Sequence, residues 1–80
     1  MSSGSWTQWT EDVLLALRLM GIESGSIFNL NKAYEAEGIL KRIHPNNNHV
    51  KAKIRQQLQI LKQHGFVRFM DNIGNYEMLK

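Results

Sequence analysis

The sequence predicts an α+β domain in which three helices, a short strand and a C-terminal β-hairpin share one core. Three stretches carry apolar residues at helical spacing, and two alternating runs near the end flank a turn signal. The length of 80 residues allows a single domain, and the hydrophobic fraction of 42% is typical of a globular chain.

The first helix is predicted to begin at Thr10, whose hydroxyl is suited to capping free backbone N–H groups. Trp9 before this cap and Leu14 after it have the spacing of a hydrophobic staple, and Gly21 ends the helix. The residues before Trp9 show no periodic pattern. We therefore expect residues 1–8 to be a flexible segment or an expression remnant, and residues 9–80 to form the domain.

A short apolar run, Ile27-Phe28, predicts the strand between the first and second helices. Asn29 is the expected cap of the second helix, and Pro45 ends that segment. The buried side of this helix is marked by Leu30, Ala33, Tyr34 and Leu40.

The strongest helical signal covers residues 48–64, and Gly65 ends it. Its apolar stripe consists of Val50, Ile54, Leu58 and Leu61. Strand-like runs at 66–70 and 75–79 surround a turn signal at 71–74. This order of elements is the winged helix-turn-helix arrangement, in which the third helix docks in the DNA major groove with the hairpin as a wing beside it.

Positive charge is concentrated in the same part of the chain. The 10 Lys and Arg residues and 7 Asp and Glu residues give a net charge of +3. No acidic residue lies between Gly38 and Met70, whereas seven of the cations do. Such a surface suits a polyanion, because each neutralised phosphate releases condensed counterions. A solvated basic helix face is the alternative that charge alone leaves open.

The face of the third helix opposite its apolar stripe carries mainly amides and one small apolar residue, at about 100° of rotation per residue. This composition suits direct base reading with flanking phosphate contacts, and a merely soluble helix surface is the alternative. The candidate base-reading residues are Asn47, Asn48, His49, Ala52, Arg55, Gln56 and Gln59. The candidate phosphate contacts are Lys51, Lys53, Lys62 and Arg42, and the candidate wing contacts are Asn72, Asn75 and Tyr76.

The run from Asn47 to Leu61, N-N-H-V-K-A-K-I-R-Q-Q-L-Q-I-L, closely resembles the recognition-helix region of DpnI-type methyl-directed restriction endonucleases. The similarity is closest from Lys53 to Leu61. It extends more loosely to Trp9-Thr10, Phe28, Leu30, Tyr34, Phe69, Gly74 and Tyr76. The sequence departs from the family pattern in the wing, where Asp71, Asn72, Ile73, Asn75 and Glu77 replace basic residues around the glycine.

The resemblance implies a domain that reads N6-methyladenine in double-stranded GATC. It also implies that cleavage belongs to a nuclease domain of the same parent chain, a type II methyl-directed restriction endonuclease. The acidic metal-binding motif and the zinc site of that nuclease domain are missing from this sequence. We therefore expect this chain to be the reader and not the enzyme.

The chemistry of N6-methyladenine sets a requirement for any reader. In a Watson–Crick pair the methyl points toward N7 and replaces the hydrogen used in a bidentate amide contact, so the protein must offer a small apolar surface there. Ala52 is the residue we place nearest the methyls, with Gln56 and Asn48 as polar partners and Arg55 or Lys53 as a candidate for guanine. The two methyls of GATC lie close together in one groove, so one monomer is expected to cover both.

Three other functions remain open. The first is a winged-helix transcriptional regulator without methyl preference, and the second is a protein-interaction domain, against which the acid-free window argues. The third is an enzyme, but His44, His49 and His64 have neither zinc-ligand spacing nor a carboxylate nearby in the sequence. We expect no catalytic residue, metal or cofactor in this domain.

Cysteine usage and hydropathy place limits on the compartment. The chain has no cysteine, which excludes disulfides and thiolate zinc sites, and the cytoplasm is the expected location. The longest apolar run, Val13 to Leu17, is far shorter than the roughly 20 residues of a membrane span, so no membrane contact is expected.

Overall fold

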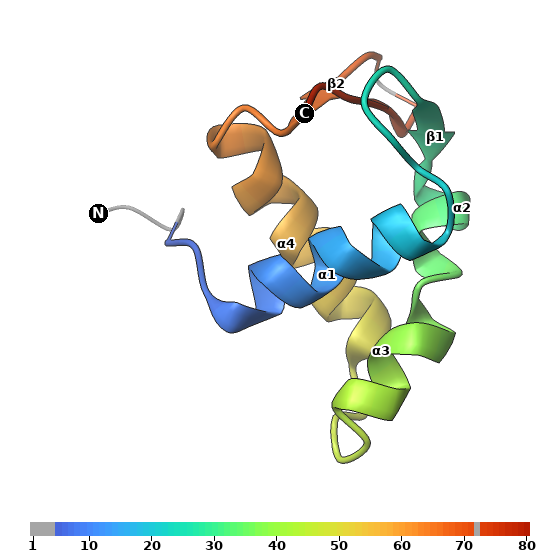
Figure 1. The fold of residues 1–80 in the computed structure, drawn as a ribbon, viewed down its shortest axis with the longest axis vertical. Coiled ribbons are helices and arrows are strands. Elements are labelled where there is room, and N and C mark those ends of the chain that lie inside the picture. The colour runs from blue at the N-terminus through green and yellow to red at the C-terminus, as the bar shows by residue number, and fades with distance from the viewer. Residues whose placement is uncertain (1–4, 72) are drawn as a thin grey trace.

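The computed structural model describes residues 5–71 and 73–80, which form a helical layer and a small sheet (Figure 1). Its helices are α1 (Gln8–Leu19), α2 (Leu30–Tyr34), α3 (Glu37–Ile43) and α4 (Val50–Gln63). Its strands are β1 (Ile27–Asn29), β2 (Val67–Phe69) and β3 (Asn75–Met78). No helix in the described residues is both long enough and apolar enough to cross a membrane.

The strands form an antiparallel sheet in the order β1-β3-β2. The β2–β3 hairpin pairs Val67 with Met78, and β1 adds to its other edge by pairing Phe28 with Tyr76. This arrangement confirms the predicted short strand and C-terminal hairpin. The α+β winged-helix fold class predicted from the sequence is therefore correct.

The start of α1 differs from the prediction. Thr7 is the N-cap, and Thr10 lies inside the helix, where its Oγ1 accepts a hydrogen bond from the backbone N–H of Thr7 at 3.1 Å. Trp9 is consequently a helical residue and does not form a staple with Leu14 from outside the helix. Trp6, which we expected in a flexible segment, packs against the ring of Phe66 with 5.0 Å between centroids.

The predicted second helix is divided into α2 and α3. The break falls at Glu35 and Ala36, although neither residue is a helix breaker. Ala33 in α2 and Ala36 in the break are both fully buried, so the chain packs against the core at the point where the helix is interrupted. Tertiary packing therefore overrides the local helical preference here.

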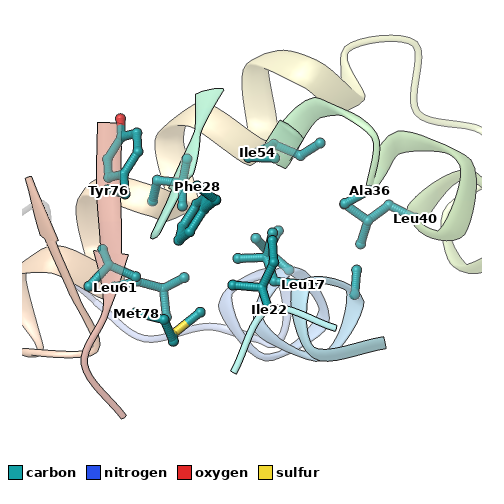
Figure 2. Packing of buried hydrophobic residues seen from close by; sticks show 14 of the residues in the cluster. Leu17, Ile22, Phe28, Ala36, Leu40, Ile54, Leu61, Tyr76 and Met78 are labelled. Carbon is teal, nitrogen blue, oxygen red and sulfur yellow. The ribbon is translucent and has the colours of Figure 1, made fainter. Parts of the chain in front are cut away.

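The core lies between α1, α3, α4 and the inner face of the sheet (Figure 2). All four stripe residues predicted for α4 are buried, and Gly65 ends this helix with a positive φ of 77°. Figure 1 shows α1 crossing α4 while the hairpin lies beyond the C-terminal end of α4. The opposite face of α4 is thereby left to solvent.

Candidate nucleic-acid interface

The exposed face of α4 has the composition that its periodicity predicted. Helix geometry places this face opposite the buried stripe, and no acidic residue lies on it. Ala52 is near its centre. The other exposed residues on this face or just before the helix are Asn48, His49, Arg55, Gln56, Gln59 and Gln63.

Three lysines border this face, and each ammonium lies over an aromatic ring. Lys53 Nζ is 5.5 Å from the ring centroid of Trp9, on the side of α1. On the other side, Lys51 Nζ is 5.8 Å from the centroid of Tyr34, and Lys62 Nζ is 5.5 Å from that of Phe69. None of the three forms an ion pair with a carboxylate of the described residues. Their charges are therefore available to an anionic partner.

Arg42 was grouped with these lysines in the sequence, but the structure gives it different neighbours. It lies on α3 and lines a separate groove together with Leu19 of α1 and Ile39 of α3. Arg42 is therefore on a different helix from the three lysines, and its phosphate contact stays a prediction.

The loop before α4 carries its own polar structure. The side-chain oxygen of Asn47 accepts a hydrogen bond from the backbone N–H of His49 at 2.7 Å, which shapes the entry into the helix. A cleft of about 410 Å³ opens beside this loop and is lined by Trp9, Ile43, His44, Pro45, Asn46 and Asn47. One candidate base-reading residue, Asn47, thus also has a structural role.

The sequence reading of the histidines missed a carboxylate partner. Nε2 of His44 lies 2.7 Å from Oδ2 of Asp12, and the His44 ring stacks on Trp9 with 3.9 Å between centroids. Asp12 also accepts a hydrogen bond from Gln8 at 3.0 Å. The residues are 32 positions apart in the chain, so local spacing carries no signal of this contact. It joins α1 to the end of α3.

The wing offers fewer free groups than the sequence indicated. Asn75 donates its amide N–H to Asp71 Oδ2 at 2.9 Å, and Arg68 pairs with Glu77 at 2.7 Å. Tyr76 is only 6% exposed, and its ring belongs to the hydrophobic core. Asn72, the third candidate wing contact, lies outside the described residues.

The carboxylate of Asp71 closes the wing turn. It accepts bonds from Asn75 Nδ2 and from the backbone N–H groups of Ile73 and Asn75, at 2.9, 3.0 and 3.2 Å. These bonds, led by the one from the Asn75 side chain, lower the pKa of Asp71 below its usual 3.8. The wing turn therefore keeps a negative charge and does not resemble a cationic clamp.

Sequence reasoning overlooked the aromatic residues that accompany the lysines. Tyr34 was assigned to the buried side of a helix, Trp9 to a staple and Phe69 to a strand. The structure places the three rings under Lys51, Lys53 and Lys62. An aromatic residue has the same appearance in a core stripe and beneath a cation, so only the tertiary arrangement distinguishes the two roles.

A comparison with known families agrees with this geometry. The family model described as the Dam-replacing HTH domain, the C-terminal domain of DpnI-type proteins, matches residues 5–78. The matched range includes all four helices, α1 to α4, and all three strands, β1 to β3. The chain belongs to the Dam-replacing HTH domain family and is a DNA-binding module without a catalytic role of its own.

Proposed function

We propose that this domain reads N6-methyladenine in double-stranded GATC. The observation that carries the proposal is the position of Ala52 near the centre of the exposed face of α4, with Gln56 and Asn48 beside it. A major-groove helix with this face offers a methyl group a small apolar surface and offers base edges amide groups. The resemblance of residues 47–61 to the DpnI-type recognition helix supports the same choice of base.

Methylation replaces one hydrogen of the adenine N6 amino group by a methyl, and this replacement changes the free energy of binding. An asparagine or glutamine facing the adenine directly would lose one of its two hydrogen bonds when N6 is methylated. Ala52 loses none, and burial of the methyl against it contributes about 0.8 kcal/mol. Each methyl is therefore expected to strengthen binding at least about four-fold.

The two methyls of GATC lie in adjacent base pairs and in one groove, so a single domain is sufficient to contact both. Lys51, Lys53 and Lys62 border the reading face and supply phosphate contacts that fix its register without carrying sequence information. We assign the chain to a methyl-directed type II restriction endonuclease, in which a nuclease domain of the same parent chain performs the cleavage.

A titration of three duplexes tests the proposal. The duplexes share one GATC sequence and are fully methylated, hemimethylated or unmethylated at adenine N6, and all are measured at one salt concentration. We expect affinity to fall in that order, by at least about four-fold at each step. Equal affinities for the three would leave an ordinary winged-helix DNA binder and contradict the proposal.

A further inference from the structure

Four side chains that can donate hydrogen bonds come from α2, α4 and β3. Lys51 and Arg55 are one turn apart on α4, and both are exposed. Tyr34 is the last residue of α2, and its ring lies 5.8 Å from Lys51 Nζ. Tyr76 lies on β3 and pairs with Phe28 of β1, the strand that leads directly into α2. Three elements thus contribute to one side of the α4 face.

The electrostatics of Tyr76 indicate which groups surround its phenol. Burial is the main cause that raises the pKa of Tyr76 above its usual 10.0, while the positive charge of Arg55 lowers it and Tyr34 raises it further. Arg55 and Tyr34 are therefore close enough to this hydroxyl to influence its ionisation. This agrees with the helix geometry, which turns Arg55 toward the side on which Lys51 lies.

The hydroxyl of Tyr76 reaches the surface although the ring is buried. The ring lies 5.5 Å from Phe28 and 5.4 Å from Phe69, centroid to centroid. Figure 2 shows the oxygen at the outer end of the ring, directed away from the labelled apolar side chains. In the described part of the chain, no buried side-chain oxygen or nitrogen lacks a hydrogen-bond partner, and no residue bonds to this hydroxyl. The hydroxyl must therefore be accessible from solvent.

The cations and hydroxyls of this cluster have no negatively charged partner within the described residues. Neither Lys51 nor Arg55 pairs with a carboxylate of residues 5–71 or 73–80, and the hydroxyl of Tyr34 is likewise without a hydrogen bond there. Two cations and two phenol hydroxyls suit a phosphodiester, because each of its two non-bridging oxygens can accept more than one hydrogen bond. The position beside the reading face makes the DNA backbone the nearest source of such an anion.

We propose that Tyr34, Lys51, Arg55 and Tyr76 form a seat for one backbone phosphate of the bound DNA. The inference rests on the proposed docking of α4 in the major groove, but not on its preference for methylated adenine. It moves Arg55 from base reading to phosphate binding. In this site, both tyrosine hydroxyls would bind the same phosphate and so fix the distance between the DNA backbone and α4.

Conservative substitutions and a modified backbone test this seat together. Tyr34→Phe and Tyr76→Phe each remove one hydroxyl and keep the ring, so thermal melting of both variants should stay close to that of the wild type. We expect each to bind fully methylated and unmethylated duplexes roughly ten-fold more weakly, because a hydrogen bond to a charged group is lost. The affinity ratio between the two duplexes should not change.

A scan with single neutral methylphosphonates along the duplex identifies the phosphate. In the wild type, one position is expected to weaken binding more than its neighbours, and that position should lose its effect in Lys51→Ala and in Tyr34→Phe. Lys41→Ala is the matched control, because Lys41 lies on α3 and pairs with Glu37 at 3.8 Å. The control should keep the wild-type scan.

Two results would overturn the phosphate seat: wild-type affinity in both phenylalanine variants, or a methylphosphonate scan that no variant alters. Failure of methyl reading has a different signature. It would appear as equal affinity for the methylated and unmethylated duplexes in the wild type, whatever the tyrosine variants do.

Discussion

Thr10 of α1 donates a hydrogen bond from Oγ1 to the side-chain oxygen of Gln57 of α4 at 2.6 Å. Both residues are almost completely buried, at 0% and 3% exposure, and they are 47 positions apart in the chain. The bond links α1 to α4, the helix whose exposed face is proposed to contact the bases. It also explains a glutamine in the core, since a buried amide is tolerated when it is paired.

Replacing Thr10 by valine is predicted to destabilise the fold. The substitution keeps the shape of the side chain but leaves the Gln57 oxygen without its donor, at a cost of about 1–3 kcal/mol in the free energy of unfolding. Urea denaturation measures this change. Thr10→Val combined with Gln57→Leu should recover part of the loss, because both polar partners are then removed. A single variant as stable as the wild type would show that water replaces the threonine.

Leu58→Ala is predicted to damage stability, whereas Gln59→Ala is not. Leu58 is fully buried on α4, and truncating a core leucine costs about 2–5 kcal/mol. Gln59 is the next residue and is exposed, so its truncation should change stability by less than about 0.5 kcal/mol. Thermal melting of the pair checks the orientation of α4. Equal melting temperatures would contradict it.

The sequence was most informative where periodicity alone determines the structure. The stripe of α4 and the two strands of the hairpin fall where the apolar pattern predicted them, because α4 buries one continuous face and β3 buries every second residue. The start of α1 was predicted one turn too late, since Thr7 and Thr10 are equally good caps and only the position of Gln57 makes Thr10 a core residue. The division between α2 and α3 has no local signal either, since neither Glu35 nor Ala36 is a helix breaker and the buried Ala33 and Ala36 are visible only in the fold.

Only the exposed residues of α4 in the candidate site could be predicted from the sequence. Ala52, Gln56 and Gln59 follow from the rotation of the helix. The neighbours of the cations do not, because Tyr34 and Trp9 approach α4 from other elements of the fold. The position of Arg42 on α3, apart from the three lysines of α4, could not be predicted either, because charge in a sequence window does not specify the face on which it lies.

The wing turn is predicted to respond to acid through Asp71. Its pKa is lowered in the fold, so the stabilisation is complete above the usual 3.8 and is lost as the pH falls through the lower folded value. The backbone amides of Ile73 and Asn75 donate to this carboxylate and should report the change in an NMR titration. In Asp71→Ala the two amide shifts should no longer titrate there. Persistence of the titration in that variant would assign it to another group.

The salt dependence of DNA binding should identify the phosphate-contacting lysines. If Lys51, Lys53 and Lys62 each neutralise one phosphate, alanine at any of them lowers the slope of log affinity against log salt by roughly 1. The slope is measured with one duplex over a series of salt concentrations, and Lys41→Ala serves as the control. A lysine whose removal leaves the slope unchanged does not contact the backbone.

Substitutions at Ala52 separate methyl reading from general DNA affinity. Ala52→Leu and Ala52→Glu both replace the small surface near the centre of the α4 face, the first by bulk and the second by charge. Since Ala52 is exposed, neither change should lower the free energy of unfolding by more than about 0.5 kcal/mol. The ratio of affinities for fully methylated and unmethylated GATC should fall toward one in Ala52→Leu. In Lys51→Ala the ratio should stay at the wild-type value while both affinities fall together, because phosphates carry no methylation mark.

An unchanged ratio in both Ala52 variants would place the methyl contact at another residue of the face. Gln56 and Asn48 would then be the next positions to replace.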